Sequence, residues 1–230
     1  MHKTDDSKRR KPTPRYPVSI PVQTQSIARP TLVTPTFLRI AFVGKICSGK
    51  TTLAKHVQRV AKQHQINVER AAFGDFVKQM ASDYFCYDEQ KHKNRDLLVQ
   101  LGTSMRNIHV DVWVNCLRKK IEGSDVKHWV VDDVRHKNEF HMLQELGFTI
   151  MRIDIDKKVQ RERILKTYPD TFDEHFAVES HSTEQEMLQG DITFDKILPT
   201  ETSKHDIEQW INGVFNTKPT HMDIGGECAQ

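Results

Sequence analysis

Residues 44–51 have the types and spacing needed to bind phosphate. They read Gly-Lys-Ile-Cys-Ser-Gly-Lys-Thr, which is the G-x-x-x-x-G-K-T pattern of a P-loop. The two glycines let the backbone turn so that successive N–H groups point at phosphate oxygens, and the N-terminus of a following helix adds partial positive charge. Lys50 is then expected to reach the terminal phosphates of a nucleotide, and the Thr51 hydroxyl to bind Mg²⁺.

The segments on both sides of this P-loop have the patterns that the motif requires. Residues 40–43 form an apolar run long enough for a buried strand, and the apolar positions after Thr51, at Leu53, Val57 and Val60, have helical spacing. A chance match in a glycine turn is the alternative reading. The unbroken order of strand, glycine loop and helix disfavours it.

A second group of polar residues follows another short apolar run, residues 129–131. Asp132 is the candidate second Mg²⁺ ligand beside Thr51, because P-loop sites need a carboxylate at a strand end. Asp133 and Arg135 would share one face of a continuing strand, and an arginine fork there matches a phosphate. The alternative is a polar turn with surface charges.

Strands and helices are predicted to alternate along the chain. Strands are predicted over residues 68–73, 129–131, 148–155 and 192–198; helices are predicted to begin at Asp75, to end at Gly102, Gly123 and Gly147, and to occupy residues 157–166 and the segment after Ser203. This order predicts an α/β fold with a parallel β-sheet and helices on both faces. Ligands of such sheets bind beyond the carboxyl ends of the strands.

The chain of 230 residues divides into three parts by composition. Six of its nine prolines lie at positions 12–35, so we expect a disordered, proline-rich, basic tail over residues 1–37. A folded domain is expected over 38–216 and a flexible tail over 217–230. Lys8–Lys11 is either a nuclear-localisation or nucleic-acid patch or a solvated basic tail, and we favour the latter.

Charge and cysteine usage restrict the class of protein. The net charge of +3 does not by itself indicate a nucleic-acid binder, and no apolar run approaches the roughly 20 residues of a membrane helix. The four cysteines have no metal-ligand spacing, which favours a reduced, cytoplasmic setting. The first residues lack the apolar segment of a secretory signal, and the basic run leaves a nuclear location open.

Five further segments have the order and spacing of landmarks in one enzyme family. They are Phe73–Lys78, similar to F-A-D-x-L-K; Arg95–Thr103, similar to R-x-L-L-Q-x-L-G-T; Asp111–Val114; Asp133–Glu139; and His181–Glu184, similar to H-x-[ST]-E. Together they resemble the deoxynucleoside monophosphate kinases of phages and large DNA viruses, from about residue 39 to 216. The chain departs from this family at Val99, where a Gln is usual, and at Phe194–Lys196, which replaces a final N-D-G turn.

The resemblance implies a P-loop NTPase fold of the nucleoside monophosphate kinase type with a helical lid. It implies transfer of the γ-phosphoryl group of ATP, bound with Mg²⁺, to a deoxynucleoside monophosphate, and it suggests a homodimer. The residues it assigns to ATP are Gly44, Lys45, Cys47, Ser48, Gly49, Lys50, Thr51 and Thr52. Those assigned to the acceptor are Asp75, Lys78, Arg95, Arg106, Trp113, Asp133, Arg135 and Glu139. The catalytic candidates are Lys50, Asp133, Arg135, Arg161 and Arg163.

Some of these assignments have alternatives. Arg161 and Arg163 are either lid arginines or part of a solvated helix face, and Trp113 is either in the base pocket or, as we favour, in the core. The acceptor could instead be another small phosphorylated molecule, as in dephospho-coenzyme A or phosphomevalonate kinases. A non-catalytic nucleotide-binding protein is less favoured, since the sequence has no N-K-x-D motif. A protein tethered to nucleic acid by its basic tail is the third alternative, although we expect neither stable nucleic-acid binding nor a membrane partner.

Overall fold

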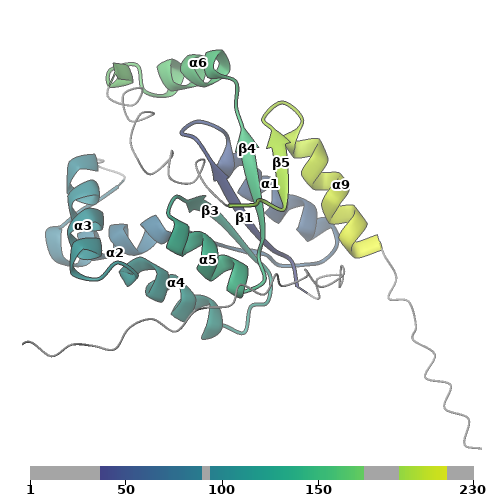
Figure 1. The fold of residues 1–230 in the computed structure, drawn as a ribbon, viewed down its shortest axis with the longest axis horizontal. Helices are drawn as coiled ribbons and strands as arrows, with labels where there is room; N and C mark the ends of the chain where they lie inside the picture. The colour runs from purple at the N-terminus through teal and green to yellow at the C-terminus, as the bar shows by residue number, and fades with distance from the viewer. Residues whose placement is uncertain (1–36, 90–93, 174–191, 217–230) are drawn as a thin grey trace, which may run out of the picture. The chain divides into compact units, whose positions relative to one another are not determined.

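The computed structural model describes residues 37–89, 94–173 and 192–216. The predicted tails, the Lys8–Lys11 run and the His181–Glu184 segment lie outside these residues. In chain order the elements are β1 (Arg39–Gly44), α1 (Lys50–Gln63), β2 (Glu69–Ala71), α2 (Phe73–Phe85), α3 (Arg95–Ile108), α4 (Val112–Glu122), β3 (Trp129–Val134), α5 (Lys137–Glu145), β4 (Thr149–Asp154), α6 (Lys157–Thr167), β5 (Lys196–Pro199) and α9 (Ser203–Asn216), as labelled in Figure 1.

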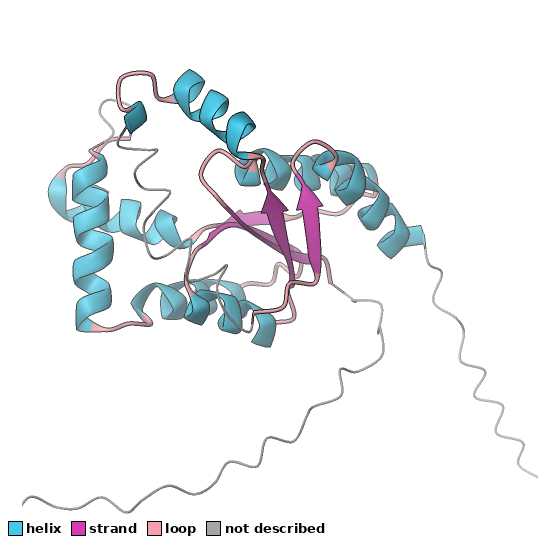
Figure 2. Ribbon diagram, turned by 45° about the horizontal axis from the view of Figure 1, so that its top comes forward, coloured by secondary structure: helices cyan, strands magenta, loops and turns pink. Residues whose placement is uncertain are grey.

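The described strands form one parallel sheet in the order β2-β3-β1-β4-β5, with helices on both of its faces (Figure 2). The alternation of side chains along β1 produces the two faces. Ile40 and Phe42 are buried in the cluster that includes α1 and α9, whereas Ala41 and Val43 belong to the cluster that includes α2, α4 and α5. The predicted α/β architecture is therefore confirmed.

The strand order places two distant segments at the same edge of the sheet. β1 lies between β3 and β4, with Val43 opposite Val134 and Gly44 opposite Ile153. The P-loop therefore leaves the sheet between the carboxyl ends of β3 and β4. A side chain at Gly44 would not fit, because a Cβ there would lie 2.8 Å from the Ile153 carbonyl oxygen.

Two predicted helix boundaries are wrong. α2 begins at Phe73 after the N-cap residue Ala72, so Asp75 lies within the first turn and the preceding strand is shorter than predicted. α3 continues through Gly102 to Ile108. Gly102 is buried there, and its carbonyl oxygen accepts a hydrogen bond from the indole of Trp113. It is thus a buried position within the helix and does not end it.

Two further strands also differ from their predictions. β3 extends to Val134, so Asp132 and Asp133 lie within the strand, and β5 begins only at Lys196. The helix ends predicted at Gly123 and Gly147 are confirmed, since Gly123 is the C-cap of α4 and Gly147 follows α5 with a φ of +74°. No described helix is both long and apolar enough to cross a membrane.

Candidate active site

The P-loop turns sharply between β1 and α1. Cys47 and Gly49 have positive φ angles of 59° and 100°, and Gly49 is the N-cap of α1. The Lys50 ammonium donates to the carbonyl oxygens of Gly44 and Lys45, at 2.5 and 2.7 Å. Lys50 therefore lies against the loop at the N-terminus of a helix, which is where an anion is stabilised.

Two polar features make this loop suitable for phosphate. The Ser48 hydroxyl is buried, 1% exposed, and has no hydrogen-bond partner among the described residues. A buried polar group of this kind is costly unless a partner satisfies it, and a phosphate oxygen would be such a partner. Thr51 and Thr52 in the first turn of α1 are exposed, so their hydroxyls are accessible.

Helix α6 follows the carboxyl end of β4 (Figure 1). Two of its side chains donate hydrogen bonds to the P-loop. Gln160 donates to the Ile46 carbonyl oxygen at 3.1 Å, and Arg163 donates to the Cys47 carbonyl oxygen at 3.3 Å. Arg161 instead stacks over the ring of Phe172, with its guanidinium 5.5 Å from the centroid. Of the two predicted lid arginines, the structure thus places Arg163 on the loop.

A cleft of about 640 Å³ opens beside the P-loop. This volume is typical of a small-molecule site. Its other walls are the end of α6, from Arg163 to Tyr168, and the loop that leads from β5 into α9, from Thr200 to Lys204. Sequence reasoning missed Gln160, Tyr168 and the second of these walls. Only residues 200–204 had a signal in the sequence, because they directly follow a predicted strand.

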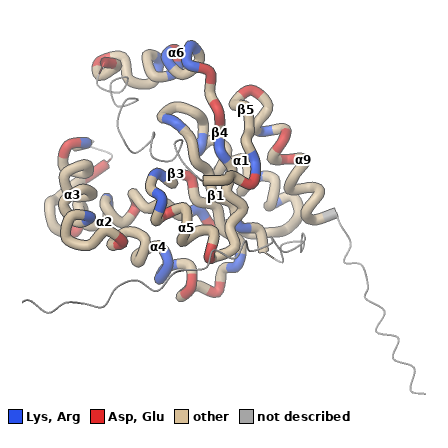
Figure 3. Tube along the Cα trace, viewed as in Figure 1, with Lys and Arg blue, Asp and Glu red and all other residues tan. Residues whose placement is uncertain are grey.

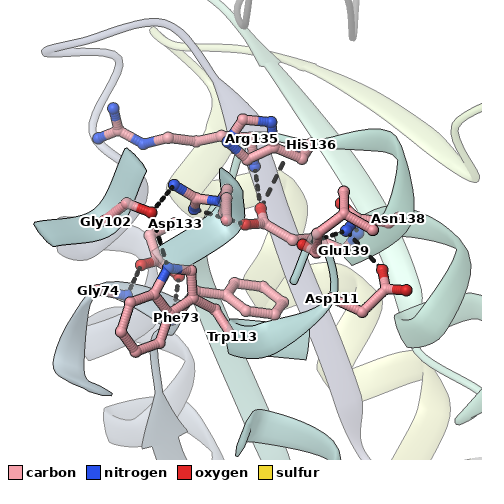
Figure 4. Close-up of polar contacts among 12 residues, drawn as sticks. Phe73, Gly74, Gly102, Asp111, Trp113, Asp133, Arg135, His136, Asn138 and Glu139 are labelled. Atoms are coloured by element: carbon pink, nitrogen blue, oxygen red, sulfur yellow. Dashed lines mark hydrogen bonds and ion pairs between the residues drawn. The ribbon is translucent and has the colours of Figure 1, made fainter. Parts of the chain in front are cut away.

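The two aspartates at the end of β3 contact different elements. The buried Asp132 pairs with Arg70 of β2 at 2.8 Å, and Arg70 also lies 3.2 Å from Asp75. The Asp133 carboxylate accepts hydrogen bonds from the backbone N–H groups of Phe73 and Gly74, at 2.9 and 2.8 Å (Figure 4). Burial raises the pKa of Asp133, and these two hydrogen bonds oppose the shift. Asp133 therefore caps α2; a direct contact with an acceptor stays a prediction.

Glu139 lies beneath the β3–α5 corner and is 2% exposed. One of its oxygens accepts from the backbone N–H groups of Arg135 and His136, at 2.8 and 3.1 Å, and the other accepts from the Arg106 guanidinium at 3.3 Å. Burial raises the pKa of Glu139 to about 7, while burial and the charges of Arg106 and Arg135 lower the pKa of His136 to about 4. Arg135, whose backbone N–H donates to Glu139, is itself exposed.

The other residues predicted to bind the acceptor lie in different surroundings. Trp113, in α4, is 2% exposed and belongs to the core cluster that also includes residues of α2, which supports the core alternative; a contact with the base stays a prediction. Lys78 is paired with Glu89 at 2.7 Å. Arg95 is the first residue of α3 and is partly exposed. Lysine and arginine nevertheless gather on the P-loop, on α6 and at the end of β3 (Figure 3).

The described residues include no group of three or more histidine, cysteine, aspartate or glutamate side chains able to hold a metal ion. A Mg²⁺ ion in a phosphate site would need only one or two protein ligands, together with phosphate oxygens and water. Thr51 and Asp132 stay the candidates for this role, with Asp132 already paired to Arg70.

Comparison with known proteins finds a family and a general fold. A family model described as an AAA domain matches residues 40–185, more than half of the chain. No curated protein matches. A sugar kinase from Janibacter sp. HTCC2649 is 14% identical with a TM-score of 0.47, over 80% of this chain and 96% of that one. The APS kinase CysC of Mycobacterium tuberculosis, in complex with AMPPNP and APS, is 15% identical with a TM-score of 0.45, over 77% and 98%. The family match and the parallel sheet with its P-loop establish an α/β P-loop NTPase fold.

Proposed function

Because the chain belongs to the AAA domain family and has a complete P-loop, we propose that it is a phosphotransferase that uses ATP with Mg²⁺. We further propose that its acceptor is a deoxynucleoside monophosphate and its product the diphosphate. The acceptor class rests on the resemblance of residues 95–103 and 133–139 to segments of deoxynucleoside monophosphate kinases. A homodimer, which the same resemblance implies, is part of this proposal.

One observation supports phosphoryl transfer most directly: two cationic groups lie at the same edge of the sheet. The first is the P-loop with Lys50, beside a cleft of nucleotide size. The second is formed by Arg135, at the end of the strand adjacent to β1, and by Arg106, which Glu139 holds from below. A protein that only bound a nucleotide would need the first group alone.

Positioning and charge neutralisation account for most of the catalysis that such a site supplies. Lys50 and the loop N–H groups would bind the donor phosphates, and Thr51 and Asp132 would hold Mg²⁺, which neutralises charge on them. Arg163 would close the donor side, because its guanidinium already contacts the loop. Arg135 and Arg106 would hold the acceptor phosphate, since a dianion beside the donor requires paired cations.

A substrate panel tests the proposal. ADP release is measured with ATP, Mg²⁺ and, in turn, each deoxynucleoside monophosphate, each ribonucleotide counterpart, dephospho-coenzyme A and phosphomevalonate. We expect turnover with one or more deoxynucleoside monophosphates and none in the Lys50→Ala variant. Turnover only with one of the other acceptors would reject the proposed acceptor, and equal ADP release without any acceptor would reject transfer altogether.

A further inference from the structure

Glu139 is a buried carboxylate whose partners come from different elements. It is the third residue of α5, its neighbours Arg135 and His136 precede that helix, and Arg106 comes from α3, 33 positions earlier in the chain. The Arg106 guanidinium also donates to the Gly102 carbonyl oxygen of its own helix at 3.4 Å. One carboxylate therefore connects α3 to the corner that presents Arg135 (Figure 4).

The burial of Glu139 separates two possible roles. At 2% exposure its oxygens face backbone N–H groups and a guanidinium, so they are not available to a ligand in solution. A buried carboxylate is costly unless it is paired and hydrogen-bonded, and these donors compensate it. Glu139 can therefore affect a bound ligand only through the two arginines that it contacts, Arg106 and Arg135.

We propose that Glu139 is a positioning residue for the acceptor phosphate. Glu139 fixes the Arg106 guanidinium and the Arg135 backbone relative to each other. The inference rests on the proposed function and assigns Glu139 a role different from direct substrate contact. Transfer requires the acceptor phosphate to be aligned with the donor. A displacement of about 1 Å in such a group costs roughly 100-fold in rate.

The charge of Glu139 is part of this role. The charged or titratable groups facing it are Asp133 from β3, Arg106 from α3, and Arg135 and His136 from the corner. The pKa of Glu139 is raised to about 7, so its protonation below neutral pH replaces an ion pair with a hydrogen bond from the charged guanidinium to a neutral carboxyl group. A neutral Glu139 holds Arg106 less firmly, and the arrangement of the two arginines loosens.

The test is Glu139→Gln, which keeps the size of the side chain and removes its charge. We expect kcat/KM for the deoxynucleoside monophosphate to fall by about 10- to 100-fold, with KM for ATP unchanged. The ratio of wild type to variant should approach one as the pH falls below about 7, because wild-type Glu139 then becomes neutral too. In an Arg106→Ala background the same substitution should have a much smaller effect, since the shared partner is gone.

Glu145→Gln is the matched control. Glu145 ends the same helix and also pairs with an arginine, Arg118, but it is exposed. Its substitution should leave both KM values unchanged. Equal losses for ATP and acceptor in Glu139→Gln, or fully additive effects with Arg106→Ala, would overturn the inference.

Failure of the proposed function gives a different result. If wild type transfers phosphate to no deoxynucleoside monophosphate, the acceptor assignment fails first. Urea unfolding of the same Glu139 and Arg106 variants then measures their coupling without any substrate, and the absence of coupling would overturn the inference as well. If Glu139→Gln does not fold, Glu139→Asp keeps the charge and both arginines but shortens the side chain that spans Arg106 and the Arg135 backbone N–H, and it must still show the acceptor-specific loss.

Discussion

Asp133→Asn separates a structural from a catalytic role for the carboxylate at the end of β3. Both Asp133 oxygens accept backbone N–H groups, from Phe73 at 2.9 Å and Gly74 at 2.8 Å. These are the first two residues of α2, whose N–H groups have no partner within the helix. Asparagine has the same shape but only one accepting oxygen, so its NH₂ group would face one of these donors.

The magnitude follows from two opposing effects. A hydrogen bond to a charged group contributes about 1.5–3 kcal/mol, and loss of a helix cap costs about 0.5–2 kcal/mol. Burial raises the pKa of Asp133, so asparagine also relieves part of a desolvation cost. We therefore expect a net destabilisation of about 1–2 kcal/mol. At roughly 2–4 °C per kcal/mol for a domain of this size, Tm should fall by about 2–8 °C.

Thermal and urea unfolding of the full chain measure this change, with acceptor and ATP kinetics on the same preparations. Asp83→Asn is the matched control, because Asp83 lies in the last turns of the same helix, is exposed, and accepts only from Gln79 among the described contacts. The control should unfold as wild type does. In Asp133→Asn, α2 should shift relative to β3, and KM for the acceptor should rise more than KM for ATP.

The reasoning fails if Asp133→Asn unfolds as wild type does. A normal Tm together with a large loss of acceptor turnover would show that Asp133 contacts the acceptor directly, as the sequence pattern predicts. A normal Tm with normal kinetics would mean that neither hydrogen bond to α2 contributes measurably.

Three further substitutions test the site. Lys50→Ala should abolish transfer while Tm holds, and residual turnover near the wild-type rate would exclude the P-loop as the donor site. Arg135→Ala should lower kcat/KM for the acceptor by about 30-fold. This corresponds to the lower end of the 2–5 kcal/mol that a paired charge contributes, because the Arg135 side chain is exposed. Arg135→Lys should restore only part of the activity, and a large loss of ATP affinity in Arg135→Ala would place Arg135 on the donor side. His136→Asn tests how the charge of His136 affects stability. The pKa of His136 is about 4 in the folded protein, below the unfolded value of about 6.5. The contribution of neutral His136 to the free energy of unfolding is therefore complete above pH 6.5 and is lost as the pH falls toward 4. Urea unfolding at pH 7.5 and 4.5 should show wild type losing about 1–2 kcal/mol more than the variant, because partial exposure of the ring reduces the effect of the shift. Equal losses would contradict the lowered pKa.

Local sequence determined the P-loop and the elements that flank it. A strand, a glycine turn and a helix follow one another within residues 39–63, so their pattern is contained in contiguous residues. The same holds for Gly147 after α5, because its left-handed φ of +74° is a conformation that glycine adopts readily. The parallel sheet followed from the alternation of such units.

Only the tertiary structure decided what the second group of polar residues does. Asp133 lies 60 positions from the Phe73 N–H it accepts, Arg106 lies 33 positions from Glu139, and Arg163 lies 116 positions from the Cys47 carbonyl it contacts. The first and third pairs meet because the strand order β2-β3-β1-β4-β5 brings separate carboxyl ends to one edge. Arg106 instead reaches Glu139 from helix α3. Local pattern cannot show which donor satisfies a buried carboxylate, since burial and pairing depend on what the rest of the chain packs against it.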